Sequence, residues 1–227
     1  MLPLGTTINA AAVIIGGAAG LLLRGRLPDA SRRVVFQALG LCIVVIGLRM
    51  ALTFSNPLPV IFSMVIGGVI GQACGIESRF ESVAVRVKRA VKASDNLFTD
   101  GLVTASLIYC VGPMAILGAF DEGLRQDPTL ILTKSMLDGF ASIALAATYG
   151  VGVLFAAVPV FLYQFSLTLF AGVLAGVFSQ PVIDQLTATG GLLIMGIGIN
   201  LLELTRIPVA NLLPALVIIV ILARVLV

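Results

Sequence analysis

Residues 4–23 read LGTTINAAAVIIGGAAGLLL and carry no charged side chain. Twenty apolar residues in an α-helix are long enough to cross the ~30 Å hydrocarbon core of a bilayer. The rest of the chain has the same character, because 59% of its 227 residues are hydrophobic and only 11% are charged. Soluble domains carry about 25% charged residues. The sequence therefore predicts an all-α, polytopic transmembrane helix bundle, with residues 1–227 forming a single integral membrane domain.

The chain divides into eight apolar stretches, each about as long as one span. They cover residues 4–23, 34–54, 58–76, 100–120, 130–150, 154–178, 187–203 and 207–226. The fifth and sixth are separated at Tyr149-Gly150-Val151-Gly152, within a region that is too long for a single span. We expect about eight spans, or seven if one piece of that region is re-entrant.

Basic residues predict how these spans are oriented. The start of the chain lacks the basic region of a secretory signal, so residues 4–23 are expected to stay as a first span. Loops 24–33 and 77–99 are rich in lysine and arginine, whereas loop 121–129 is net acidic. Because cytoplasmic loops carry the positive excess, both basic loops are expected in the cytoplasm, with loop 121–129 and both termini outside.

Residues 77–92 form the one sizeable polar segment. Phe80, Val83, Val87 and Val91 recur at helical spacing, and the basic side chains fall mostly around the other face. This pattern predicts a basic amphipathic helix lying against anionic lipid headgroups. A solvated linker helix between two halves of the protein explains the pattern equally well. The pI near 9 reflects this charge distribution and does not indicate nucleic-acid binding.

An internal repeat links residues 40–70 to residues 191–221 without gaps. Identical residues include Gly40 with Gly191, Gly47 with Gly198 and Pro57 with Pro208. The repeat predicts two three-span units, 1–76 and 154–227, separated by the linker 77–99 and a central hairpin 100–150. An offset of five spans would turn the second copy upside down, which is a common plan among transporters. The alternative is that apolar helices resemble one another by chance.

Pairs of glycines four residues apart occur in several spans. They are Gly16 with Gly20, Gly67 with Gly71, and Gly172 with Gly176. Such pairs let two helix backbones approach closely, either within one subunit or between the subunits of a homo-oligomer. The first and third pairs also extend the similarity between the two three-span units.

Charged residues inside hydrocarbon are costly and mark candidate functional positions. Lys134 and Asp138 lie four residues apart in the fifth span, which places them on one face of a helix. Asp138 is too short and too deep to reach the interface. We expect it to pair with Lys134 or to bind a cation in a water-filled cavity. The alternative is an ion pair that holds two helices together.

The fourth span contains a kink motif. Pro113 removes a backbone donor and frees a carbonyl group, and Gly112 beside it eases the bend. Ser106 and Cys110 fall on the same face as Pro113, so these groups are expected to line a polar pocket at mid-membrane. Packing alone is the alternative explanation of the kink. Two further polar residues in apolar spans, Asn9 and Asn200, are candidates for the same pathway.

Enzyme and metal signatures are missing from the sequence. The chain has no histidine, and its three cysteines, Cys42, Cys74 and Cys110, lack metal-ligand or redox spacing. It has no nucleophile–base pattern and no phosphate-binding loop. We therefore expect no enzymatic activity, no cofactor and no metal site.

Five motifs resemble a known bacterial family. They are GTTIN at 5–9, TASLIYCVGPMAILGAFDEG at 104–123, LTKSMLDGF at 132–140, GGLLIMGIGINLL at 190–202 and PVANLLPAL at 208–216. In this order they are similar to the membrane proteins grouped as domain of unknown function 554 (DUF554), over essentially the whole chain. The resemblance implies a multi-pass protein of the bacterial inner, or cytoplasmic, membrane. It implies no substrate.

These patterns together favour a small transporter or channel with a polar site on the fourth and fifth spans. Its solute is expected to be a small ion or polar metabolite, because so short a chain leaves no room for a large vestibule. The alternative is a structural or accessory membrane protein with no substrate. Solvent access at Asp138 separates the two hypotheses, because an ion pair that only joins helices should be dry.

Overall fold

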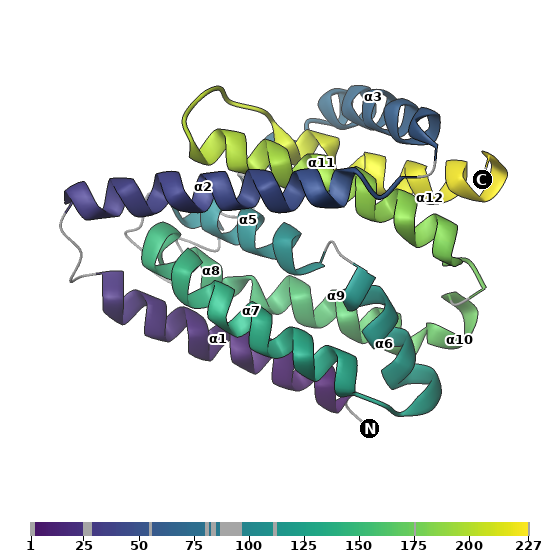
Figure 1. Ribbon diagram of the computed structural model, residues 1–227, viewed down its shortest axis with the longest axis horizontal. Coiled ribbons are helices and arrows are strands. Elements are labelled where there is room, and N and C mark those ends of the chain that lie inside the picture. The colour runs from purple at the N-terminus through teal and green to yellow at the C-terminus, as the bar shows by residue number, and fades with distance from the viewer. Residues whose placement is uncertain are drawn as a thin grey trace. The chain divides into compact units, whose positions relative to one another are not determined.

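The computed structural model describes residues 3–24, 29–54, 56–79, 82, 85–86, 97–110, 113–174 and 176–226. It is 86% helical, and no strand occurs in these ranges, so the all-α class is confirmed. The helices are α1 (Leu4–Arg24), α2 (Asp29–Ala51), α3 (Pro57–Cys74), α5 (Phe98–Cys110), α6 (Pro113–Arg125), α7 (Thr129–Tyr149), α8 (Gly152–Phe155), α9 (Ala157–Leu169), α10 (Ala171–Leu174), α11 (Gln180–Leu201), the 3₁₀ turn η1 (Val209–Leu212) and α12 (Pro214–Leu226) (Figure 1).

Five helical segments are long and apolar enough to cross a membrane. They are α1, α3, α7, the segment Gly152–Leu169 and α11. A sixth is obtained if α5 and α6 are counted together, although the two are bent by 59° relative to each other. Two shorter apolar segments, Gly40–Ala51 and Val209–Val225, accompany them. The described part of the chain thus has five or six candidate spans.

Several helix ends follow directly from the local sequence. The Asn56 side chain accepts a hydrogen bond from the Leu58 N–H and so caps α3, whose first turn carries Pro57. Gly75 ends α3 in the left-handed conformation, with φ of 60°. Gly150 ends α7 with φ of 87° and ψ of −151°, a region that is essentially restricted to glycine. The predicted break between the fifth and sixth stretches is therefore confirmed.

Two predicted boundaries are wrong. Helix α6 continues to Arg125, so the expected loop 121–129 shrinks to three residues. Helix α11 begins at Gln180 rather than near residue 187, with Pro181 in its first turn. Both boundaries were misplaced because the helix turns in question contain polar residues such as Glu122 and Gln185, which interrupt the apolar runs. Both side chains are nevertheless buried. Most of the predicted amphipathic helix 77–92 lies outside the described residues.

The chain forms two compact units, each built from separate stretches of sequence. One consists of residues 1–32 and 84–176, and the other of residues 33–83 and 177–227. The three-span units predicted from the repeat, 1–76 and 154–227, therefore each contribute helices to both compact units. The predicted division into 1–76, 77–99, 100–150 and 154–227 stays a prediction.

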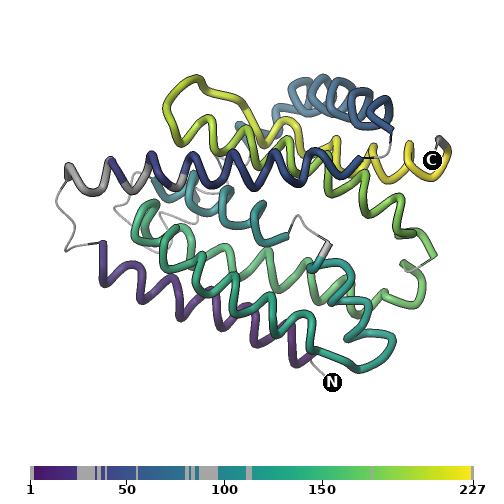
Figure 2. The backbone as a smooth tube through the Cα atoms, in the orientation of Figure 1, coloured from purple at the N-terminus to yellow at the C-terminus, as the bar shows by residue number. Residues whose placement is uncertain are grey.

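In the first unit, α1 and α7 lie side by side and run in the same direction (Figures 1 and 2). Two glycines of α1 make the close approach possible. A Cβ atom on Gly16 would stand 2.1 Å from the Gly139 carbonyl oxygen, and one on Gly20 would stand 2.3 Å from that of Ile143. The predicted close packing at this glycine pair is confirmed. The similar pair Gly172 and Gly176 differs, because α10 ends before Gly176 and a Cβ on Gly172 would meet nothing within 4 Å.

Changing Gly16 to alanine is expected to destabilise the protein by about 1–3 kcal/mol, because the new methyl group must displace the backbone of α7. Changing Gly172 to alanine is the matched control and should leave stability nearly unchanged. Thermal unfolding of the two purified variants in detergent provides the comparison. Equal unfolding temperatures for both would contradict the close packing of α1 on α7.

In the second unit, α2 and α11 cross in opposite directions through glycine contacts. Gly40 packs against Gly198 and Leu202, whereas Gly47 packs against Gly191 and Met195. Helix α3 also runs opposite to the segment formed by η1 and α12. A Cβ on Gly67 would meet Ala215, and one on Gly71 would meet the Asn211 backbone. The Asn211 side chain ties these elements together, because it donates to Gln72 Oε1 and accepts from the Glu77 N–H.

Large apolar side chains are exposed along the long helices. Leu22 of α1 is 77% exposed, Phe140 of α7 is 69% exposed and Val69 of α3 is 66% exposed. Soluble proteins rarely expose extended apolar surface of this kind, whereas a lipid bilayer accommodates it. The exposed side chains therefore agree with an integral membrane protein.

Candidate functional site

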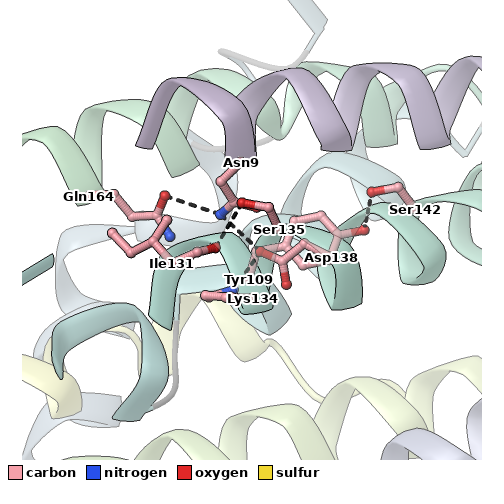
Figure 3. A network of polar contacts seen from close by, with 8 residues as sticks. All are labelled: Asn9, Tyr109, Ile131, Lys134, Ser135, Asp138, Ser142 and Gln164. Carbon is pink, nitrogen blue, oxygen red and sulfur yellow. Dashed lines mark hydrogen bonds and ion pairs between the residues drawn. The ribbon is translucent and has the colours of Figure 1, made fainter. Parts of the chain in front are cut away.

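The charged residues predicted in the fifth span form a buried ion pair on α7. Lys134 Nζ donates to Asp138 Oδ2 over 2.5 Å, and both side chains are less than 10% exposed. Asp138 lies nine residues into the helix, about 13 Å along its axis at ~1.5 Å per residue. The expected pairing of Asp138 with Lys134 is thus present (Figure 3).

Two amide side chains from other helices extend this pair into a network (Figure 3). Asn9 of α1 donates from Nδ2 to Asp138 Oδ2 and to Gln164 Oε1 of α9, each over 3.1 Å. Asn9 and Gln164 have no exposed surface. An ionised carboxylate only accepts hydrogen bonds, so the Asn9 atom facing Asp138 must be its NH₂ group. That group also faces Gln164, which must therefore present its oxygen.

The network leaves two polar atoms without a partner. The Asn9 Oδ1 acceptor and the Gln164 Nε2 donor are buried and make no hydrogen bond among the described residues. An unpaired polar group buried away from water costs about 1–3 kcal/mol. Most buried polar groups in native proteins are paired, so two unpaired atoms on neighbouring side chains require an explanation. Ordered water or a bound polar solute could pair with these atoms.

An aromatic residue completes the site from α5. The Lys134 ammonium lies 5.9 Å from the centre of the Tyr109 ring, within range of a cation–π interaction. The Tyr109 hydroxyl is 2.7 Å from Ser142 Oγ, one turn beyond Asp138 on α7. Tyr109 immediately precedes Cys110, where α5 ends. The carbonyl groups that end a helix carry partial negative charge, which favours a cation such as Lys134 nearby.

The other predicted site residues have different roles in the structure. Ser106 donates to the Leu102 carbonyl of its own helix over 2.6 Å. Asn200, in the second unit, bonds both backbone groups of Ile207 and so fixes the loop after α11. Cys110 is partly exposed at the end of α5. Pro113 begins α6, and Gly112 lies outside the described residues.

Four residues of the first unit were not predicted as site residues. Tyr109, Ser142 and Gln164 belong to the network, and Glu122 binds the first turn of α1 through Gly5 and Thr6. Ser142 could have been predicted, because it lies four residues after Asp138 and so on the same face of the helix. Gln164 was visible only as a polar residue in an apolar stretch, because its partner is 155 positions away.

The arrangement brings one ammonium group, one carboxylate and two amide side chains close together. Among the described residues, no three potential ligands gather in a way that could hold a metal ion. The charges of Lys134 and Asp138 cancel, while the amides of Asn9 and Gln164 supply one free acceptor and one free donor. Such a combination can recognise hydrogen-bonding groups and opposite charges.

A family model described as "Protein of unknown function (DUF554)" matches residues 4–224. The chain belongs to this family. It is 36% identical to "Uncharacterized membrane protein YdfK" of Bacillus subtilis (strain 168), over 94% of this chain and 93% of the relative. It is 28% identical to "Uncharacterized protein YqgA" of Escherichia coli (strain K12), with the same shares covered. No solved structure matches the chain. The DUF554 membership predicted from motifs is confirmed, and so is the membrane character.

Proposed function

We propose that this DUF554 protein is a transporter or channel for a small solute, and not an enzyme. Its binding site is the network of Lys134 and Asp138 on α7 with Asn9 on α1, Gln164 on α9 and Tyr109 on α5. We place the protein in the bacterial inner membrane, in line with its similarity to a B. subtilis membrane protein. Contacts with anionic headgroups through residues 77–92, and assembly into homo-oligomers, are part of this proposal.

The unpaired amide atoms of Asn9 and Gln164 carry the proposal. A network that only joins helices gains stability when every polar group is paired, and a partly satisfied network is worse than an apolar contact. Two unpaired atoms next to a charged pair are therefore expected where a ligand binds. The break between α5 and α6 beside this network is a second support, because transporters commonly build midplane sites from discontinuous helices.

The alternative is a structural or accessory membrane protein in which Lys134 and Asp138 only join helices. The low exposure of the Asp138 side chain, 9%, favours this reading, because a pathway residue should be accessible to water at some stage. A carrier with its site closed on both sides would also bury Asp138. The transport experiment described below separates the two.

We propose eight spans, counting the bent pair α5–α6 as one and including the two shorter apolar segments. The directions of packed helices support this count. In an eight-span order, α1 and α7 are the first and fifth spans, and their glycine contacts run in parallel. Helices α2 and α11 are the second and seventh, and their contacts run antiparallel. Both directions agree with spans that alternate across the membrane.

We also propose that the two three-span units are inverted repeats. In the sequence repeat, Gly40 matches Gly191 and Gly47 matches Gly198. The contacts join Gly40 with Gly198 and Gly47 with Gly191. Exchanging the two copies therefore maps this pair of contacts onto itself, as expected for antiparallel copies related by a two-fold axis. This reciprocity supports inverted repeats of the kind found in transporters.

Purified full-length protein in liposomes tests the proposed function. We expect at least one solute from a panel of inorganic ions and small metabolites to enter faster than into protein-free liposomes. Changing Asp138 to asparagine should abolish this uptake while the protein still inserts and elutes as a single species. Asp121→Asn is the matched control, because Asp121 lies at the surface and pairs with the exposed Arg125. No uptake of any solute, or equal uptake by wild type and Asp138→Asn, would overturn the proposal.

A further inference from the structure

The unused hydrogen-bonding capacity of the buried network is of two kinds. Two acceptor atoms remain free to accept hydrogen bonds from a ligand. One is Asn9 Oδ1, and the other is Asp138 Oδ1, because the described hydrogen bonds to Asp138 all reach its Oδ2 atom. Donor capacity remains on Gln164 Nε2 and on the Lys134 ammonium, which has three N–H groups and uses one on Asp138. A ligand that satisfies both kinds must carry acceptors and donors together.

The fixed charges of the network sum to zero. Lys134 contributes one positive charge and Asp138 one negative charge. Another buried carboxylate of this unit, Glu122, accepts hydrogen bonds from the Gly5 N–H and the Thr6 hydroxyl at the start of α1. The partial positive charge of that helix end offsets part of the Glu122 charge. An ion of either sign would therefore bring an uncompensated charge into a buried site, which is costly.

A molecule with one positive and one negative group avoids this cost. Its ammonium group would bind the Asp138 carboxylate and Asn9 Oδ1, and its carboxylate would bind Lys134 and Gln164 Nε2. The internal ion pair would be exchanged for two ion pairs with the ligand, so the sum of charges stays zero in both states. An uncharged solute, by contrast, would use the two amides and leave the charged residues without a role.

We propose that the ligand of this site is a small zwitterion, with one ammonium and one carboxylate, of the amino acid type. This inference rests on the proposed transport function and assigns its substrate class. It also predicts electroneutral movement, because neither the ligand nor the site carries net charge. Without ligand the site would be neutral as well, since Lys134 and Asp138 then compensate each other.

Uptake by liposomes containing the full-length protein tests the substrate class. The zwitterionic probes are radiolabelled glycine, alanine, serine and proline. Acetate and methylammonium each represent one half of a zwitterion, and urea represents an uncharged polar solute. We expect uptake of at least one zwitterion and none of the half-probes or urea. A potassium diffusion potential set with valinomycin should leave the rate of uptake unchanged.

Three variants connect the uptake to the site. Lys134→Gln and Asp138→Asn should each lower zwitterion uptake by about tenfold or more, because each removes a charged hydrogen-bonding partner of the ligand. Asn9→Leu removes the free acceptor and should raise the half-saturating concentration while the charges stay in place. Size-exclusion chromatography of each variant confirms that it is folded.

The possible results separate this inference from the proposed function. Uptake of acetate, methylammonium, urea or an inorganic ion that depends on Asp138, with no uptake of the zwitterions, would overturn the substrate class and leave transport standing. Zwitterion uptake that follows the potassium potential would also overturn the neutral-site argument. Absence of uptake for every probe, or uptake unaffected by Asp138→Asn, would overturn both.

Discussion

Changing Lys134 to methionine is expected to destabilise the folded protein by about 3–5 kcal/mol, because Asp138 would keep a buried charge without its cation. The two side chains are only 8% and 9% exposed, so water cannot replace the lost partner. For a chain of this length such a loss lowers the unfolding temperature by roughly 10 °C. Thermal unfolding of the purified variant in detergent measures the change.

Two further variants make this expectation specific to a buried pair. The double change Lys134→Met with Asp138→Leu replaces both charges by apolar groups, and such replacements are often neutral or stabilising. Its unfolding temperature should therefore recover toward that of the wild type. Arg125→Met removes the cation of an exposed pair and should cost less than about 1 kcal/mol. A double variant as unstable as Lys134→Met would contradict the ion-pair interpretation.

The site elements predicted from sequence are those that depend on local spacing. Lys134 and Asp138 are four residues apart, and any continuous helix brings such residues onto one face. The break at Gly150 follows from the conformational freedom of glycine. The close approach at Gly16 follows from the absence of a side chain. Each of these features is decided within one or two helical turns.

The network around the ion pair depends on contacts that spacing does not contain. Asn9 reaches Asp138 across 129 positions and Gln164 across 155 positions. Hydropathy marks each as a polar residue in an apolar stretch but cannot name its partner, because several such residues compete for the same role. Packing of α1 against both α7 and α9 selects Asn9 and Gln164. Asn200 fixes a loop instead.

The burial of Glu122 is another feature that depends on a long-range contact and could not be predicted from local sequence. Its neighbours Asp121, Arg125 and Asp127 made the region 121–129 resemble a polar external loop. In the structure Asp121 and Arg125 pair at the surface, and Asp127 accepts a hydrogen bond from the Thr129 N–H at the start of α7. That bonding to Thr129 lowers the pKa of Asp127. Glu122 alone turns inward, which its charge would not predict.

Changing Glu122 to alanine is expected to destabilise the protein by about 3 kcal/mol, because buried donors at the start of α1 lose a charged acceptor. Glu122 accepts from the Gly5 N–H over 2.6 Å and from the Thr6 hydroxyl over 3.2 Å. The first N–H groups of a helix have no partner within it, and a negative charge there is favoured. Thermal unfolding of the purified variant should show the loss.

The adjacent Asp121→Ala change is the matched control for Glu122→Ala. It removes a carboxylate from the same helix, but one that pairs with an exposed arginine, so its cost should stay below about 1 kcal/mol. Glu122→Gln separates charge from hydrogen bonding, because an amide oxygen can still accept from Gly5 while its NH₂ group faces the Thr6 donors. Its stability should lie between those of the wild type and Glu122→Ala. Equal stabilities for Glu122→Ala and Asp121→Ala would mean that α1 does not depend on this carboxylate.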